Sequence, residues 1–596
     1  MNLKIALMTA PAVGLLMSTG ADYGGSSNDL LITPHGKTPT TQTAQSNAHN
    51  SSIGDPSSAG GNYVSQGQVG WGDAWDSTLS ITQVGGYNTV GTGVPPNYWG
   101  IGQYDGSNYL SIYQGYGLGS GYDPHNNVTE VHQYGYSGTY QGFYVNQTSI
   151  TQYYDDRIGV ISQQFQGSSG ANVVSINQHG SGNGGNNVSS VTQTGHDNTL
   201  SLPMTNNNVG PDNGVGAFTN QGAAAIAANP VSYGVPNSLI PAGFTPIGQA
   251  TVTQSGDHNG ISFSIDGGGN LFGFEQVGNG NSISGGITGG YADEVAIAQV
   301  GTDINTINAL MSGSYNKLGA FQVGDGSNTG WANLSGTDNQ GALVQVSESG
   351  GSNTGTVQTG ASSSDNAVGV LQYASNGGSN NGTATANGSD NIVGVVQYAS
   401  GGSNNGNVGV ASGSSNVAVL GQYASGGGSN SAGVTINGNN NNVLTGTTPS
   451  SYSGGHSASV LASQLGYFNP HGSTINSEAD GLSGETNFLQ ASIGSLGSQI
   501  GSYNLLTPGL MTQIANGGTN SLSMNVTGDG NLFSTLQDGS GAGSNTLNAT
   551  VLGGSNELAV AQVTSGGTNV AYVTQNGYGN SAGVVQVGTN SATFNQ

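Results

Sequence analysis

The chain has 596 residues, of which 107 are glycine and only 6% are charged, a composition unlike that of an average globular enzyme. Its formal charge is −25 and it contains only 4 Lys and Arg residues, so it offers no basic surface that could bind nucleic acid. The absence of cysteine excludes disulfides, thiolate metal sites and cysteine nucleophiles. The composition therefore predicts no nucleic-acid partner and a fold stabilised by backbone pairing.

The N-terminal residues 1–21 are predicted to be a signal peptide, because Lys4 precedes an apolar stretch and small residues follow it near Ala21. This stretch is shorter than the roughly 20 residues of a membrane span. No later segment is long and apolar enough either, so we expect a secreted chain with no transmembrane segment. Residues 22–60 are rich in Ser, Thr, Gly and Asn without periodicity and are predicted to be a flexible leader.

A seven-residue unit organises the rest of the chain: an Asn is followed six positions later by a Gln, with apolar residues at alternate places between them. In the unit from Asn391 to Gln397, Val393, Val395 and both amides share one face, because side chains alternate along a strand. In stacked coils each buried amide can donate to one neighbouring coil and accept from the other. We expect a structural ladder of Asn316, Gln322, Asn339, Gln345, Asn366, Gln372, Asn391, Gln397, Asn416, Gln422, Asn556, Gln562, Asn580, Gln586, Asn590 and Gln596, with the same spacing at Asn127/Gln133 and Asn187/Gln193.

The fold class predicted from this repeat is all-β: an amyloid-like β-solenoid of stacked strand-turn-strand coils, with two strands in each coil of about 22–25 residues. Gly and Asn in the links between strands indicate tight turns. Tyr373, Tyr398 and Tyr423 recur with the coil and predict an outward aromatic column. Packing between coils is the simpler role for this column, and adhesion is the alternative.

The domain organisation follows from where the repeat holds. Repeats are predicted at 61–202, 249–443 and 499–596, the last ending without a cap, which favours polymerisation. Residues 203–248 are predicted to be a proline-rich insertion or irregular coil, and 444–498 to be irregular coils. The sequence leaves open whether the stack continues through these two interruptions.

The turns carry a resemblance to a known family. The segments Gln178-His-Gly-Ser-Gly-Asn183 and Gln575-Asn-Gly-Tyr-Gly-Asn580 resemble curlin repeats, and the match covers most of residues 62–596. The resemblance implies a self-assembling subunit of curli, the adhesive amyloid fibres of the biofilm matrix. It further implies a nucleator and an outer-membrane secretion pore as partners, and the cell surface of a Gram-negative-type bacterium as the location.

Two other classes of function are alternatives to a fibre subunit. A β-helical enzyme would need a carboxylate pair, but Asp155 and Asp156 are adjacent on the chain and are expected to lie in solvated turns, so no catalytic residue is predicted. The second alternative is a monomeric cell-surface adhesin or carbohydrate-binding solenoid.

The turns carry acids and histidines that are potential metal ligands. The turn acids could hold Ca²⁺ weakly, but Asp is also a good turn residue. The turn histidines are expected to be surface residues, because no helix places a pair at the spacing of a zinc site. No metal or cofactor is predicted at these turn positions: Asp197, Asp257, Asp338, Asp390, Asp529, His132, His179, His196 and His258.

Overall fold

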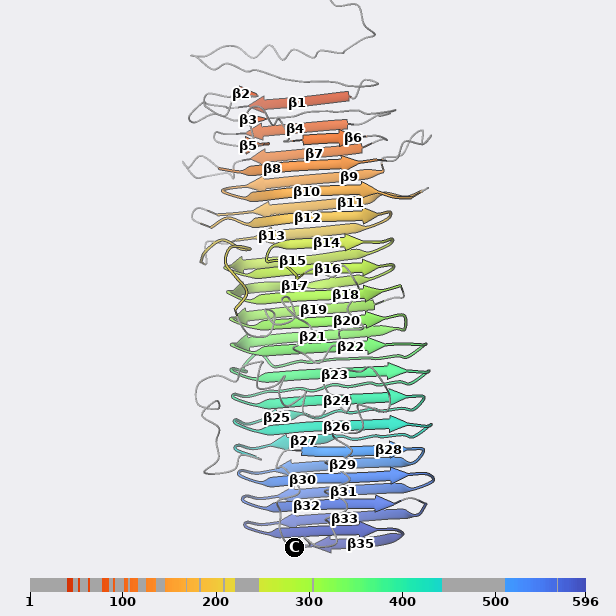
Figure 1. The fold of residues 1–596 in the computed structure, drawn as a ribbon. Coiled ribbons are helices and arrows are strands. Elements are labelled where there is room, and N and C mark those ends of the chain that lie inside the picture. The colour runs from red at the N-terminus through yellow and green to blue at the C-terminus, as the bar shows by residue number, and fades with distance from the viewer. Residues whose placement is uncertain are drawn as a thin grey trace, which may run out of the picture. The chain divides into compact units, whose positions relative to one another are not determined.

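The computed structural model describes residues 40–46, 52–53, 63–64, 78–84, 89–91, 101–104, 108–115, 125–135, 145–167, 169–181, 184–206, 210–219, 246–302, 305–441, 510–564 and 566–596. The chain divides into two compact units: unit 1 is Met1–Asn213 with Gln254–His258, and unit 2 is Gly214–Thr253 with Asn259–Gln596. All named elements in the described ranges are β-strands (Figure 1). Over the same ranges, no helix has the length and apolar character needed to cross a membrane.

Unit 1 is built from two parallel sheets, and successive strands along the chain alternate between them from β7 onward. Each coil therefore gives one strand to each sheet. The first sheet holds β1 (Thr40–Ser46), β4 (Thr78–Val84), β7 (Asn108–Gly115), β9 (Asn146–Tyr153), β11 (Asn172–His179) and β13 (Thr199–Thr205). The second holds β2 (Ser52–Ile53), β3 (Tyr63–Val64), β5 (Thr89–Val90), β6 (Ile101–Tyr104), β8 (Asn127–Tyr134), β10 (Arg157–Phe165) and β12 (Asn187–Gly195).

Unit 2 repeats this plan, and the boundary between the units falls within β14 (Thr251–Ser255). One sheet holds β15 (Gly260–Gly268), β17 (Ser282–Tyr291), β19 (Asn305–Ser314) and β21 (Asn328–Thr337). A long sheet holds β16 (Leu271–Gly278), β18 (Glu294–Gly301), β20 (Lys317–Gly324), β22 (Gln340–Ser347), β23 (Ala367–Ser375), β24 (Ile392–Ser400), β26 (Val417–Ser425), β28 (Leu510–Asn516), β30 (Leu532–Ser540), β32 (Glu557–Thr564) and β34 (Ser581–Val587). A third holds β25 (Val410–Ser412), β27 (Val434–Asn437), β29 (Thr519–Thr527), β31 (Ser544–Leu552), β33 (Thr568–Asn576) and β35 (Asn590–Asn595).

Each unit is thus a β-solenoid, which confirms the predicted fold class. Coils in the long sheet of unit 2 measure 23 residues between Gln299 and Gln322 and 27 between Gln345 and Gln372. In unit 1 the coils measure 30 residues between Gln133 and Gln163 and 26 between Gln152 and Gln178.

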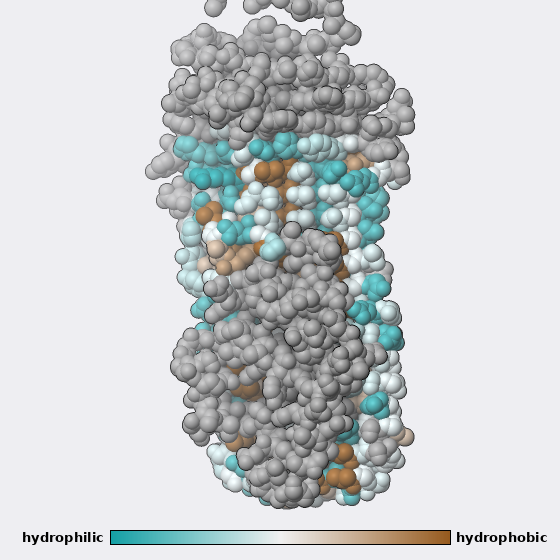
Figure 2. Space-filling view, in the orientation of Figure 1, coloured by the Kyte–Doolittle hydropathy of each residue, from teal (hydrophilic) through white to brown (hydrophobic). Residues whose placement is uncertain are grey.

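The core lies between the facing sheets, because alternate side chains point inward. In β29, Leu522, Met524 and Val526 are buried, whereas Ser521 and Ser523 between them are exposed. This alternation is what a strand buried on one face requires. On the surface that Figure 2 shows, hydrophilic residues gather at the margins and apolar residues appear between them.

The spacing of the buried amides in the second sheet of unit 1, in strands β8, β10 and β12, corrects a detail of the sequence prediction. In β10 both Ile158 and Ile161 are buried with two half-exposed residues between them, so each such strand contains one extra residue. The buried Asn therefore precedes the Gln by seven positions, and the predictions of Asn127 and Asn187 were wrong by one residue. The buried residues are Asn126 and Asn186.

Several predicted segments lie outside the described residues: the signal peptide at 1–21, most of the leader at 22–60, most of the insertion at 203–248, and all of 444–498. Strands β1 and β2 fall within the range predicted as leader, and β13 continues through Pro203 to Thr205. In unit 2, β26 pairs with β28 and β27 pairs with β29. The stack therefore continues across the second interruption, which the sequence left open.

Candidate functional site

A column of buried glutamines runs along the long sheet of unit 2. Each Nε2 donates to the Oε1 of the glutamine one coil later in the chain, at N···O distances of 2.6–2.9 Å. Each side chain is buried, so the bond supplies the partner that the amide loses when it leaves water. The column consists of Gln276, Gln299, Gln322, Gln345, Gln372, Gln397, Gln422, Gln513, Gln537, Gln562 and Gln586.

A column of asparagines runs beside it at the turns that precede these strands. From Asn339 to Asn556 each Nδ2 donates to the Oδ1 of the residue one coil earlier, at 2.8–3.1 Å. The donors of the two columns thus point in opposite directions along the stack, so their dipoles oppose each other. The asparagines are Asn316, Asn339, Asn366, Asn391, Asn416, Asn441, Asn531 and Asn556, and Asn580 joins through its backbone N–H, 3.0 Å from the Asn556 Oδ1.

Two predicted ladder residues, Asn590 and Gln596, lie outside the glutamine and asparagine columns of the long sheet. Asn590 donates to the Oδ1 of Asn569 at 3.3 Å, in the column of the third sheet, and Gln596 accepts from the Nε2 of Gln575 at 3.4 Å. Both Asn590 and Gln596 are exposed. The other predicted members lie in the two buried columns of unit 2, except Asn580, which is half-buried.

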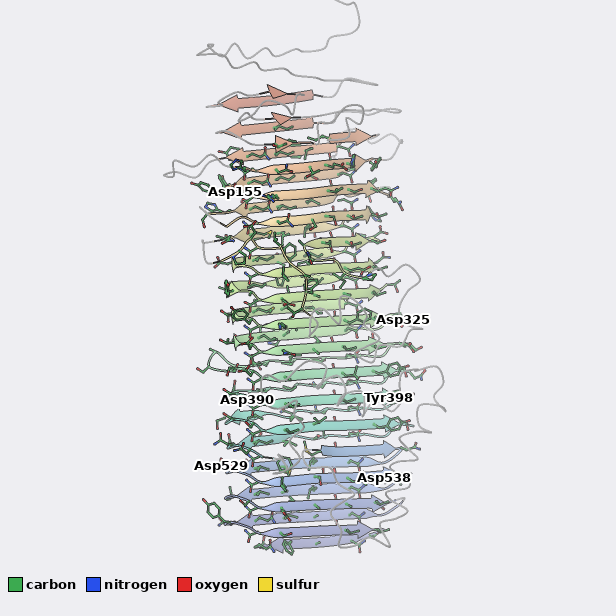
Figure 3. The ribbon with its side chains drawn as sticks, turned by 60° about the vertical axis from the view of Figure 1, so that its left-hand side comes forward. Asp155, Asp325, Asp390, Tyr398, Asp529 and Asp538 are labelled. Carbon is green, nitrogen blue, oxygen red and sulfur yellow. The ribbon has the colours of Figure 1, made fainter. Side chains whose placement is uncertain are left out.

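The three tyrosines form one stack on the outer side of the coils. The ring of Tyr398 lies 5.0 Å from that of Tyr373 and 4.9 Å from that of Tyr423, with planes within 3° of parallel. Tyr398 is only 3% exposed between its neighbours. Figure 3 shows Tyr398 on the same margin of unit 2 as Asp538, opposite Asp390. The burial of the central ring favours packing between coils as the role of this column.

A carboxylate replaces the amide at one position in each unit. Asp293 occupies the asparagine column of unit 2, where its Oδ1 accepts from the backbone N and the Nδ2 of Asn316 at 2.7 and 3.1 Å. Its Oδ2 is buried and has no hydrogen-bond partner. Burial raises the pKa of Asp293 to about 7, because removal from water disfavours the charged form.

Asp156 takes the equivalent place in unit 1, between Asn126 and Asn186. Its Oδ1 accepts from the backbone N and Nδ2 of Asn186, both at 2.9 Å, and its Oδ2 accepts from the backbone N of Tyr153 at 2.9 Å and of Gly180 at 3.2 Å. Burial raises the pKa of Asp156 to about 7 although these bonds lower it. The expectation that Asp156 lies in a solvated turn was therefore wrong, because Asp156 is buried. The adjacent Asp155 is half-exposed and pairs with His125.

The remaining turn acids hold the chain in tight turns. Asp338 and Asp390 have φ angles of 54° and 57°, in the left-handed region that Asp and Asn tolerate. Asp529 accepts from the backbone N of Asn439 at 2.6 Å, which links two turns. In the described part of the chain, Asp338, Asp390 and Asp529 do not belong to a group of three residues that could hold a metal ion.

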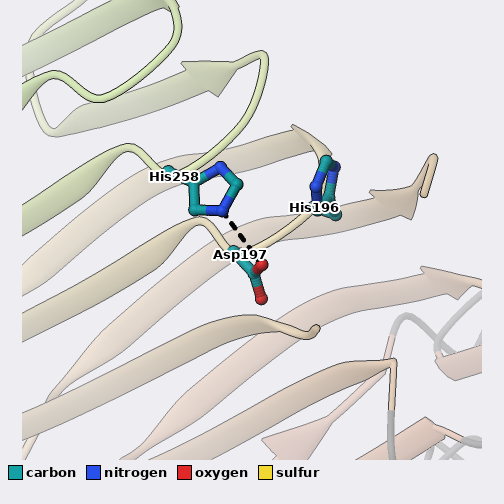
Figure 4. A group of neighbouring side chains, drawn as sticks. All are labelled: His196, Asp197 and His258. Atoms are coloured by element: carbon teal, nitrogen blue, oxygen red, sulfur yellow. Dashed lines mark ion pairs between the residues drawn. The ribbon is translucent and has the colours of Figure 1, made fainter. Parts of the chain in front are cut away.

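One cluster in unit 1 was missed by sequence reasoning. His196, Asp197 and His258 each offer a ligand atom, and these atoms lie within 4.8 Å of one another. Figure 4 shows the two rings on either side of the Asp197 carboxylate. The sequence contains His196-Asp197 in one turn and Asp257-His258 in another. Only the stacking of those two turns brings these four residues together.

No protein-family model, curated protein or solved structure was found to be similar to this chain. The class of protein is therefore defined by the fold and its columns: a parallel two-sided β-solenoid whose coils are joined by buried amide ladders.

Proposed function

We propose that the chain is a secreted structural subunit that self-assembles into extracellular curli-like amyloid fibres of the biofilm matrix, which serve adhesion and cell aggregation. The observation that carries this proposal is the glutamine column of unit 2, in which every coil presents the same donor and acceptor to its neighbours. A coil of a second copy can offer the same partners as a coil of the same chain. Such a column can be extended from molecule to molecule.

Backbone pairing supports the same arrangement. The strand pairs in the described part of unit 2 are parallel, and from β23 to β26 they pair residue by residue without a shift. Neighbouring strands of a sheet lie about 4.8 Å apart, and this distance is the repeat of cross-β fibres. Secretion is supported by the apolar N-terminal stretch, and the curli-type pore and nucleator by the resemblance of the turns to curlin repeats.

The experiment starts from the chain Asp22–Gln596, purified in denaturant and diluted into buffer. We expect thioflavin fluorescence to rise after a lag together with sedimentable fibres, and the lag to shorten when fragments of those fibres are added. Seeds of an unrelated amyloid serve as the control and should leave the lag unchanged. Seeding separates assembly from folding, because a monomeric solenoid already contains stacked strands.

A chain that stays a monodisperse, β-rich monomer at high concentration, with or without seeds, would overturn the fibre proposal. That outcome would favour a monomeric adhesin or carbohydrate-binding solenoid. Sedimentation velocity distinguishes the two results directly.

A further inference from the structure

Two successive turns of unit 1 carry the same residue types in opposite order. The turn after β12 reads Gly195-His196-Asp197, and the turn after β14 reads Gly256-Asp257-His258. Backbone bonds hold one turn on the other: Gly256 N donates to Thr194 O at 2.9 Å, and His258 N donates to His196 O at 3.0 Å. The inverted order therefore places each histidine beside an aspartate of the other turn.

The side chains meet in two close pairs. The His258 Nε2 lies 3.4 Å from the Asp197 Oδ2, and the His196 Nδ1 lies 2.6 Å from the Asp257 Oδ1. The second pair is not aligned as a hydrogen bond, so the buried Nδ1 of His196 has no hydrogen-bond partner. The two imidazole rings are 5.1 Å apart at 73°. Two nitrogen ligands and a carboxylate thus face a common space (Figure 4).

The turn beneath leaves room for these groups because it contains glycines. A Cβ on Gly170 would lie 1.7 Å from the Asp197 Oδ1, and a Cβ on Gly167 would lie 2.7 Å from the ring of His196. The Ala171 N–H donates to the Asp197 Oδ1 at 2.9 Å, which fixes the carboxylate and leaves Oδ2 directed to His258. Asp197 is therefore held, while His258 is 63% exposed and able to adjust.

We propose that His196, Asp197 and His258 bind a divalent transition-metal cation such as Zn²⁺, which clamps two successive coils of unit 1. Two imidazoles and one carboxylate are ligands that Zn²⁺ accepts, and water completes the coordination. Ligand atoms of a tetrahedral zinc site lie roughly 3.3 Å apart, so a modest rotation of His258 closes the present spacing. Asp257 adds negative charge beside the His196 ring and orients it, as carboxylates do behind metal-bound histidines.

The test is titration of the folded chain Asp22–Gln596 with Zn²⁺ by calorimetry, and with Co²⁺ by visible absorbance. We expect one site of micromolar or tighter affinity and d–d bands typical of nitrogen and oxygen ligands. The variants His258→Asn and Asp197→Asn should each weaken binding at least tenfold. Asn is chosen because both positions have positive φ, at 59° and 55°, which Asn tolerates.

The matched control is His125→Asn, which removes a histidine that pairs with Asp155 at 3.2 Å outside this cluster. It should leave the Zn²⁺ affinity unchanged. Equal binding by the wild type and the His258→Asn and Asp197→Asn variants would overturn the proposal, as would loss of the site in His125→Asn. A circular dichroism spectrum unchanged from the wild type shows that a variant that has lost the metal still folds.

Discussion

At the scale of single residues, the two buried aspartates show how the same chemical group acquires opposite roles. Around Asp156 both carboxyl oxygens accept from N–H groups, which belong to Tyr153, Gly180 and Asn186. Around Asp293 only Oδ1 meets donors, and Oδ2 takes the place where the other residues of the column carry an amide NH₂. The same substitution to Asn should therefore have opposite effects at the two sites.

We predict that Asp293→Asn stabilises the protein at pH 8. Because the pKa of Asp293 is raised in the folded state, between pH 4 and 7 the folded state holds a proton that the unfolded state has lost. The unfolding free energy therefore falls as the pH rises through this window. The wild type should lose on the order of 2–4 kcal/mol of unfolding free energy across it from this group. Guanidinium midpoints at pH 4 and pH 8 check this, and an unchanged pH dependence in the variant would contradict it.

We predict that Asp156→Asn destabilises the protein at pH 4, by about 1–3 kcal/mol, because an NH₂ group would face the N–H groups of Tyr153 and Gly180. At this pH the raised pKa keeps the buried Asp156 carboxyl neutral, so the substitution does not also remove a charge from the folded chain. Denaturant unfolding followed by far-UV circular dichroism measures the change. A midpoint equal to or above that of the wild type would show that these two bonds do not stabilise the folded chain.

At the scale of the element, the turns set the spacing of the coils. Gly413 has a φ of 115°, and a Cβ there would lie 1.8 Å from the carbonyl oxygen of Gly438 in the next coil. Gly388 and Gly553 are in the same situation against Gly413 and Gly577. Close approach of the backbones, rather than flexibility, is what requires glycine at these positions.

Gly413→Ala should accordingly lower the unfolding free energy by about 2 kcal/mol or more, because both the φ angle and the contact with Gly438 must relax. Gly433→Ala is the matched control, since nothing lies within 4 Å of its Cβ position and its φ is not in the left-handed region. Thermal unfolding of the two variants measures the difference. Equal losses would contradict the assigned role of the turn glycines.

The sequence predicts those features of the strands and turns that depend on the spacing of nearby residues. The spacing of Asn391 and Gln397 fixes which face of the strand is buried, so the amide columns follow from periodicity alone. The bulge that buries Asn126 instead of Asn127 depends on packing against the neighbouring coils. A carboxylate such as Asp156 in a turn sequence suggests solvent exposure, and only its position in the column shows that it is buried.

The His196 cluster illustrates the same limit. His196 and Asp257 lie in different turns, 61 positions apart in the sequence. The contact between these turns therefore depends on which coils are neighbours. That register is set by strand pairing across a long interruption, and no local pattern encodes it. In unit 2 the pairing of β26 with β28 likewise spans a long segment of chain.

At the scale of the whole molecule, similar coils repeat along the stack within each unit. In unit 2 the glutamine donors point to later coils, and the donors of the neighbouring asparagine column point to earlier coils. Both columns repeat from coil to coil, which is consistent with growth by addition of further copies.

The most direct test of this account is X-ray diffraction from aligned fibres of the chain Asp22–Gln596. Stacking of coils along the fibre predicts a sharp reflection at about 4.8 Å on the meridian, because strands then lie across the fibre axis. Fibres whose 4.8 Å reflection lies on the equator would contradict the account, because their solenoids would pack side by side with the amide columns across the fibre.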